Sequence, residues 1–251
     1  MTTIDLFSPA VQTYWKQQFE GRIIHTDQTF ILCVNDRLAE DSQVMTLEFP
    51  DGTGWAVISP KVLEILDPEQ FEFIDLERFI GFLKQNQITL HGADYVFYFP
   101  ESEKKKLAEQ TFPESTRLLT PDDRAFFTAF EAGASEQDLD DAYVELDHWK
   151  VGGTFENNRL ASAASIYPWE TGSFIADMGV LTLHDFRGKG YAAQTVQAIS
   201  KMALQEGYEP QYRCQLDNES SVALAQKLKL TFFAKWNVIS RESTEKLSTE
   251  I

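Results

Sequence analysis

Two glycines and two basic residues stand together in residues 187–192, which read Arg-Gly-Lys-Gly-Tyr-Ala. The apolar run before them, residues 177–183, predicts a strand, and the residues from Tyr191 onward predict a helix. Glycines let a backbone approach a ligand closely, and the N–H groups at a helix start attract anions. The loop therefore predicts a site for a phosphate or pyrophosphate. Its candidate ligand-binding residues are Arg187, Gly188, Lys189, Gly190, Tyr191 and Ala192.

Two other phosphate-binding patterns fit this loop less well. Residues 188–193 also match Gly-x-Gly-x-x-Ala, a dinucleotide-binding fingerprint, with Asp217 as a possible ribose ligand. In that fold, however, the strand runs almost directly into the first glycine, whereas residues 183–187 intervene here. The chain after Asp217 is also too short to complete such a sheet. An NAD-dependent enzyme is therefore the less favoured interpretation. A P-loop is excluded because no Ser or Thr follows Lys189.

A second motif follows downstream, in residues 218–232, which read Asn-Glu-Ser-Ser-Val-Ala-Leu-Ala-Gln-Lys-Leu-Lys-Leu-Thr-Phe. Together with the loop pattern Arg-x-x-Gly-x-Ala it resembles the GNAT superfamily of acetyl-CoA-dependent N-acetyltransferases. The resemblance covers about residues 116–240. The pairing with an N-terminal part also resembles two-domain bacterial acetyltransferases related to a zwittermicin-type self-resistance enzyme.

The resemblance implies how acetyl-CoA, the co-substrate, would be held. In this family the strand before the loop splays from its neighbour and pairs with the pantetheine arm. That role would fall on Val180, Leu181 and Thr182, which are also expected to be buried strand residues. Asn218 would contact the CoA arm, although capping of the following helix explains an asparagine there equally well.

Acetyl transfer to an amine requires a base, because the amine must lose a proton before or during its attack. Asp177 is the candidate, since a carboxylate beside apolar residues is costly unless it is solvated or partnered; a strand-end residue at the sheet edge is the alternative. Many family members carry a tyrosine as general acid where this chain has Ala225. Tyr212, Ser221 and Cys214 are possible substitutes. No Ser–His or Cys–His pair adjoins the loop, so direct attack is favoured over an acyl-enzyme.

The elements that must position these residues follow from periodicity and capping signals. Thr120-Pro121-Asp122-Asp123 and the segment from Ser135 each predict a helix start. Strands are expected at about 149–156, 159–168 and 173–183, with a tight turn at Asn157-Asn158. A helix at 191–206, a strand at 211–216, a helix at 218–229 and a strand at 231–240 follow. We therefore expect a GNAT-like α/β (α+β) domain at 116–251, with a mixed, mostly antiparallel sheet flanked by helices. A smaller α/β domain of unknown role is expected at 1–115.

The composition of the chain limits the classes of partner that it is expected to bind. The net charge of −17 disfavours nucleic acid and anionic membranes, and no apolar run is long enough to span a bilayer. The two cysteines and four histidines show no metal spacing, and a cytoplasmic protein is expected. Acidic residues between 136 and 147 could attract a cationic amine or simply solvate a helix face. The expected substrate is a small-molecule amine and the expected state a monomer or homodimer. The alternative function is a catalytically silent acyl-CoA-binding sensor or scaffold.

Overall fold

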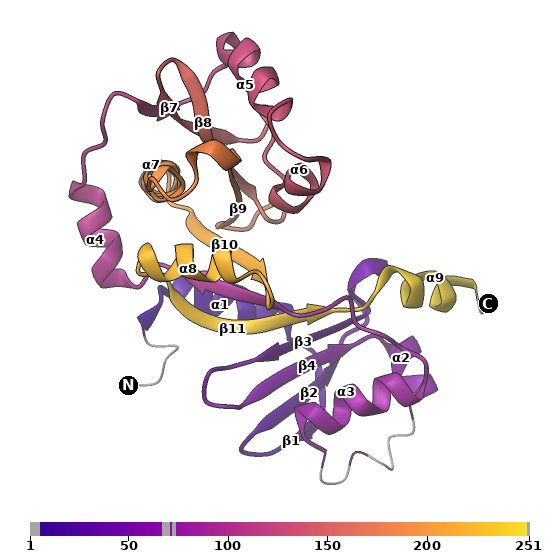
Figure 1. Ribbon diagram of the computed structural model, residues 1–251. Helices are drawn as coiled ribbons and strands as arrows, with labels where there is room; N and C mark the ends of the chain where they lie inside the picture. Colours follow the sequence, from indigo (N-terminus) through magenta and orange to yellow (C-terminus); the bar gives the residue numbers. More distant parts are fainter. Residues whose placement is uncertain (1–5, 67–70, 72–73, 250–251) are drawn as a thin grey trace. The chain divides into compact units, whose positions relative to one another are not determined.

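The structure is a computed structural model that describes residues 6–66, 71 and 74–249. Its chain forms two compact units from interleaved segments (Figure 1). Unit 1 contains the residues up to Val11, Phe97–Arg213 and Glu219–Thr231, and unit 2 contains Gln12–Val96, Cys214–Asn218 and the residues from Phe232 onward. Each unit is made of three segments that are separate in the sequence. The expectation of a single boundary between residues 115 and 116 stays a prediction.

Unit 2 is built around five strands in the order β1-β2-β4-β3-β11. Neighbours are antiparallel except β2 and β4, which run parallel. Phe30 and Phe79 lie in its core, and their rings are 5.8 Å apart. The elements with all residues in this unit are β1 (Arg22–Thr26), β2 (Phe30–Val34), η2 (Glu40–Ser42), β3 (Val44–Glu48), β4 (Gly54–Ile58), α2 (Pro60–Ile65), α3 (Leu76–Gln85) and α9 (Arg241–Thr249). Helix α1 (Pro9–Gln18) and strands β5 (Asp94–Tyr98), β10 (Glu209–Gln215) and β11 (Thr231–Val238) contribute residues to both units.

Unit 1 holds the sheet that carries the predicted loop. Its strands are β6 (Thr116–Leu118), β7 (Lys150–Glu156), β8 (Arg159–Pro168), β9 (Ile175–Thr182) and the first part of β10. Neighbours from β6 to β9 are antiparallel, and β9 and β10 are parallel. Asn157 and Asn158 both have left-handed φ values, 50° and 60°, as a two-residue hairpin turn requires. The mixed, mostly antiparallel sheet predicted from the sequence is confirmed.

Helices cover both faces of this sheet. A Cβ at Gly152 on β7 would contact Thr195 and Ile199 of α7 (Tyr191–Gln205), whereas one at Gly153 would meet Leu160 of the opposite core. Successive strand residues face opposite sides, so α7 lies on one face, and α5 (Arg124–Glu131) and α6 (Glu136–Ala142) lie on the other. The remaining elements of the unit are α4 (Glu101–Glu109), η4 (Pro121–Asp123), η5 (His184–Phe186) and α8 (Glu219–Lys227).

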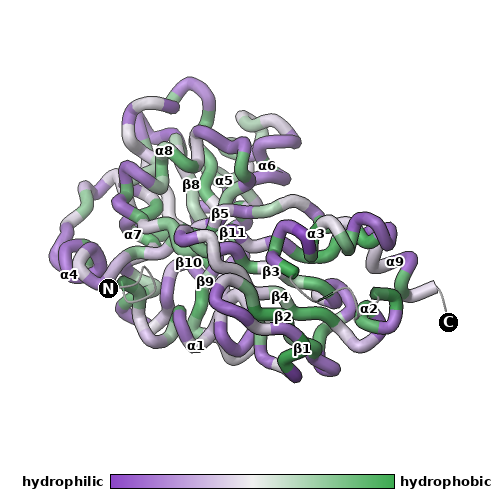
Figure 2. Tube along the Cα trace, turned by 90° about the horizontal axis from the view of Figure 1, so that it is seen from below, coloured by the Kyte–Doolittle hydropathy of each residue, from purple (hydrophilic) through white to green (hydrophobic). Residues whose placement is uncertain are grey.

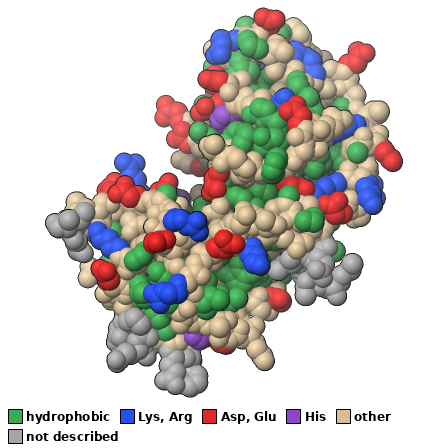
Figure 3. Space-filling model, turned by 180° about the vertical axis from the view of Figure 1, so that it is seen from behind, with side chains coloured by type: hydrophobic (Ala, Val, Ile, Leu, Met, Phe, Trp, Pro, Cys, Tyr) green, Lys and Arg blue, Asp and Glu red, His purple; other side chains and the backbone are tan. Residues whose placement is uncertain are grey.

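The predicted helix starts are confirmed. Thr120 and Asp123 form a capping box, and the Ser135 hydroxyl accepts a hydrogen bond from the Asp138 N–H at 3.1 Å. Figure 2 shows α4 as mainly hydrophilic and β2 as hydrophobic. On the face shown in Figure 3, acidic and basic side chains are interspersed. In the part of the chain that the structure describes, no helix is both long and apolar enough to cross a bilayer.

Candidate functional site

Strand β9 separates from β10 halfway along its length. Its pairing with β10 runs from Ile175–Glu209 to Met178–Tyr212, while its pairing with β8 continues to Thr182. Among the described residues, 179–182 therefore face a strand on one side only. The site begins at this open edge.

Hydrogen bonding identifies the backbone groups that line the open edge. The Leu183 N–H donates to the Ala161 carbonyl on β8 at 3.1 Å. Antiparallel strands alternate, so Leu181 also faces β8, and the backbone groups of Val180 and Thr182 face the side that β10 has left. The Thr182 carbonyl accepts from Arg187 Nε on that side at 3.1 Å. Of the three residues predicted to bind pantetheine, two thus present backbone groups to the edge.

Gly179 marks the start of the separation and is required by close packing. An ideal Cβ there would lie 1.8 Å from the Ala142 carbonyl oxygen and 3.2 Å from that of Tyr143. Tyr143 ends α6 in a left-handed conformation, with φ of 44°. The end of α6 therefore rests on the β9 backbone, on the face opposite α7.

The predicted loop has the geometry of an anion site. Gly188 and Gly190 have left-handed φ values of 79° and 88°. Gly190 is the N-cap residue of α7 and has no side chain that could accept from the first N–H groups of the helix. Within the described chain, the backbone N–H groups of residues 188–192 have no hydrogen-bond acceptor. Unpaired donors at the start of a 15-residue helix attract negative charge.

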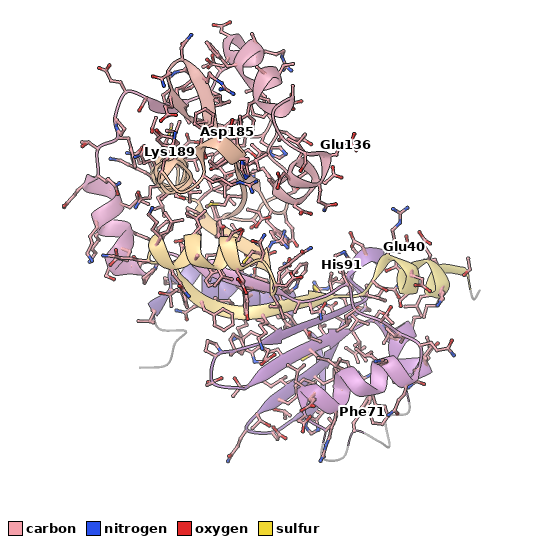
Figure 4. All side chains as sticks on the ribbon, viewed as in Figure 1. Glu40, Phe71, His91, Glu136, Asp185 and Lys189 are labelled. Atoms are coloured by element: carbon pink, nitrogen blue, oxygen red, sulfur yellow. The ribbon has the colours of Figure 1, made fainter. Side chains whose placement is uncertain are left out.

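The basic side chains of the loop are paired with carboxylates. Arg187 Nη2 lies 3.1 Å from Asp138 on α6, and Lys189 Nζ lies 2.9 Å from Glu156 on β7. Glu156 also accepts the Tyr191 hydroxyl at 2.7 Å, and the hydrogen bonds from Tyr191 and then Lys189 lower the pKa of its carboxyl. Figure 4 labels Lys189 at the start of α7. The charges of the loop are therefore largely balanced within unit 1.

A further cation, which the sequence does not mark, lies beside the loop. Lys227 Nζ, at the end of α8, is 3.4 Å from the position of a Cβ on Gly190. Lys227 is exposed and forms no ion pair or hydrogen bond among the described residues. It is thus available to an anion held by the loop. Its position depends on the packing of α8, which no spacing rule gives.

Asp177 is buried in a polar network on β9. Its Oδ1 accepts from Gln211 Nε2 and Arg213 Nε, each at 3.1 Å, and its Oδ2 accepts from Arg213 Nη2 at 2.9 Å. The Tyr167 hydroxyl donates to Oδ2 at 3.4 Å, and the Arg213 guanidinium lies 4.0 Å from the centre of the Trp169 ring. Both carboxylate oxygens are occupied, which favours a bracing role. The prediction that Asp177 is the base remains untested.

Tyr212, one of the candidate acids, is not brought to Asp177. Tyr212 pairs with Met178, and register partners share a face, so Tyr212 lies on the opposite face of the sheet from Asp177. Tyr212 is buried, with its ring 6.3 Å from Phe97. Burial raises the pKa of the Cys214 thiol to about 12.

The downstream motif forms α8 and the turn before it. The Asn218 N–H donates to the Gln215 carbonyl at 3.1 Å, directly before the helix, and Ser221 lies in the first turn of α8. Ala225, at the position where the family often has tyrosine, is fully buried. The assigned roles of Asn218 and Ser221 remain predictions.

One polar cluster near the open edge was not predicted. His148 Nδ1 lies 2.7 Å from Ser165 Oγ on β8, and the His148 ring lies 5.0 Å from that of Tyr143 and 4.6 Å from that of Tyr167. Ser165 is the register partner of Gly179. Nothing in the sequence signals this contact, because it joins the loop after α6 to a strand through tertiary packing.

Comparison with known proteins identifies the family of this chain. The family model described as GNAT acetyltransferase matches residues 87–239, more than half of the chain. Among solved structures, a GNAT-family protein of Novosphingobium aromaticivorans is 17% identical with a TM-score of 0.43, and the match covers 61% of this chain and 66% of that one. A GNAT-family acetyltransferase of Colwellia psychrerythraea is 17% identical with a TM-score of 0.48, over 67% of this chain and 63% of that one.

An aminoglycoside N-acetyltransferase solved in complex with CoA is 20% identical with a TM-score of 0.36, over 45% of this chain and 88% of that one. The matched part is less than two thirds of each of the first two chains. No curated protein gives a match to this sequence.

Proposed function

This chain belongs to the GNAT acetyltransferase family, and we propose that it transfers an acetyl group from acetyl-CoA to the primary amine of a small molecule. Acetyl-CoA would supply an activated thioester carbonyl. The observation that carries the proposal is the loop at residues 188–192, whose backbone N–H groups have no acceptor in the described chain. The finer relationship to two-domain self-resistance acetyltransferases remains part of the proposal.

The loop fits a pyrophosphate in shape and charge. Nothing lies within 4 Å of a Cβ position on Gly188, and the nearest atom to that of Gly190 is Lys227 Nζ, so the backbone can be approached closely. The N–H donors of the loop, the dipole of α7 and the charge of Lys227 all favour a negatively charged ligand. Arg187 fixes the loop to the end of β9 through the Thr182 carbonyl. In the proposal, residues 187–192 and Lys227 hold the pyrophosphate.

The open edge fits an extended chain with amide groups. Val180 presents its backbone N–H and carbonyl there, and Thr182 presents its N–H. An arm with two amides can add to this edge as a further strand. A backbone N–H aimed at the thioester oxygen would stabilise the negative charge that develops during attack. Val180 and Thr182 therefore fit the pantetheine-binding role that the family resemblance implies, whereas the backbone groups of Leu181 face β8.

The acceptor would approach from the face of α6, where the helix and the following loop carry many carboxylates. Figure 4 labels Glu136 at the start of this helix. Negative charge raises the local concentration of a cationic amine. A small-molecule primary amine with cationic character is the acceptor class we propose.

Binding of acetyl-CoA tests the cofactor assignment directly. We expect micromolar affinity by isothermal titration calorimetry for the wild type, and loss of binding in Gly190→Glu, which places a carboxylate in the loop. Gly207→Glu is the matched control: φ of Gly207 is 85°, against 88° for Gly190, and no atom lies within 4 Å of its Cβ position. Equal loss of binding in both variants, or wild-type binding of NAD that acetyl-CoA does not displace, would contradict the proposal.

A catalytically silent acyl-CoA-binding module is the second candidate. The buried Ala225, in place of the family tyrosine, is the observation that favours it. Thiol release in the presence of acetyl-CoA and a panel of primary amines separates the two. Binding without turnover across the panel would support the silent module.

A further inference from the structure

A histidine whose side chain is 12% exposed lies next to the point where β9 leaves β10. His148 contacts Ser165 Oγ, and Ser165 pairs with Gly179, the residue directly before the open edge at Val180. Ser165 Oγ is also 3.5 Å from the Tyr143 carbonyl, which lies against Gly179 as well. His148 is therefore on the α6 face of the sheet, beside the residue at which the open edge begins.

The contacts around Ser165 Oγ favour one tautomer of His148. The Glu145 N–H, which can only donate, points to Oγ at 3.4 Å. The Tyr143 carbonyl, which can only accept, lies 3.5 Å from Oγ and is an acceptor for its single hydroxyl proton. With its own proton directed at that carbonyl, Oγ accepts from His148 at 2.7 Å, and this arrangement places the ring proton on Nδ1 and the lone pair on Nε2.

Nε2 has a carboxylate nearby. It makes no hydrogen bond among the described residues, it is not wholly buried, and it lies 3.6 Å from Glu145 Oε2. The rings of Tyr143 and Tyr167 pack against the imidazole and hold its plane. Burial lowers the pKa of His148 below its usual value, which favours the neutral imidazole. A neutral, oriented imidazole with a free lone pair can accept a proton.

We propose that His148 is the general base for the acceptor amine, with Glu145 stabilising the imidazolium that forms. This assignment rests on the proposed acetyl transfer. The amine nitrogen forms a bond to the acetyl carbonyl carbon, and its proton goes to His148 Nε2. The carbon–sulfur bond breaks, and its electron pair leaves on the CoA sulfur. The acceptor class is a primary amine that arrives past Glu145 and Asp147, whose charges would favour cationic compounds.

Other groups in the cluster fit this role less well. Ser165 is fully buried, so it cannot reach a substrate and acts as a positioning residue for His148. Both oxygens of Asp177 are already occupied, and among the described residues Asp177 contacts the cluster through the Tyr167 hydroxyl. The charged and titratable groups facing His148 are thus Glu145 and Asp147 from its own loop, Tyr143 from the end of α6 and Tyr167 from β8.

The first test needs no substrate. Nitrogen-15 NMR of the full chain, with the four histidines assigned by single substitutions, reports the tautomer and the titration of each imidazole. We expect His148 with protonated Nδ1 and a midpoint below the usual value of about 6.5. In Ser165→Ala we expect a shift toward protonated Nε2. A protonated Nε2 in the wild type would overturn the assignment whatever the enzyme acetylates.

The second test measures thiol release from acetyl-CoA with tyramine and spermidine as probe amines. His148→Gln should lower kcat/KM about 10²- to 10⁴-fold, abolish the acid limb of the pH profile and leave the Kd for acetyl-CoA unchanged. His91→Gln, an exposed histidine in unit 2, is the matched control. A loss below tenfold in His148→Gln would refute the role.

Failure of the proposed acetyl transfer gives a different result from failure of the base assignment. If the wild type binds acetyl-CoA but acetylates neither probe, the acetyl-transfer proposal fails for those amines. The NMR result then decides the base assignment alone: protonated Nδ1 with a low midpoint supports it, and protonated Nε2 overturns it.

Discussion

Replacing Asp177 by asparagine should mainly lower the free energy of unfolding and should have a smaller effect on kcat. The carboxylate accepts two hydrogen bonds from Arg213 and one from Gln211 while 4% exposed. Removing one partner of a buried ion pair costs about 3–5 kcal/mol. The side chain of Arg213 is 23% exposed, so water compensates part of that loss, and we expect about 3 kcal/mol, at the low end of this range. For a protein of this size that corresponds to roughly 6–12 °C in Tm.

Urea unfolding of Asp177→Asn, Arg213→Met and the double variant measures the interaction. In the Arg213→Met background, Asp177→Asn should lower the free energy of unfolding by about 2 kcal/mol less than it does in the wild type. This difference is within the usual range of coupling energies for residues in contact. Asp36→Asn is the control, because Asp36 is exposed and its side chain makes no hydrogen bond in the described chain. An unchanged urea midpoint for Asp177→Asn, together with a hundredfold loss of kcat, would show that the carboxylate is the base and that the bracing role is wrong.

Two further variants test the loop and the strand edge. Lys227→Gln should weaken acetyl-CoA binding about threefold at low salt and less at high salt, because salt screens an exposed charge. Calorimetry at two ionic strengths measures this effect. The control variant, Lys229→Gln, is expected to bind acetyl-CoA as the wild type does. Gly179→Ala should lower the free energy of unfolding by at least about 2 kcal/mol, since its Cβ would overlap the Ala142 carbonyl oxygen at 1.8 Å. Urea unfolding measures that loss, and wild-type stability in Gly179→Ala would mean that α6 does not rest on β9.

The parts of the site that could be predicted are those fixed by local chemistry. The capping box at Thr120 needs only side chains three residues apart, and the turn at Asn157-Asn158 needs only residues that tolerate left-handed φ. The loop is local too, because its glycines and the helix that follows determine where the N–H groups point.

The remaining parts depend on strand register and helix packing, which composition and spacing do not give. Asp177 meets Arg213 because β9 and β10 pair in one particular register. Lys227 reaches Gly190 through the packing of α8, and His148 reaches Ser165 across the end of α6. Each contact joins segments far apart in the chain, so each residue looks ordinary in its own sequence neighbourhood.

The interleaving of the two units has a consequence for synthesis on the ribosome. In unit 2, β3 pairs with β11, and Lys235 on β11 donates to Glu48 at 3.0 Å, 187 residues later in the chain. While the intervening chain is being made, β3 has an open edge, which is a surface on which other nascent strands can aggregate. Unit 2 can close only after the strand that completes it has left the exit tunnel. A ribosome-bound chain halted before residue 231 should therefore depend strongly on chaperones, whereas the β6–β9 sheet of unit 1 already has its strands by residue 182.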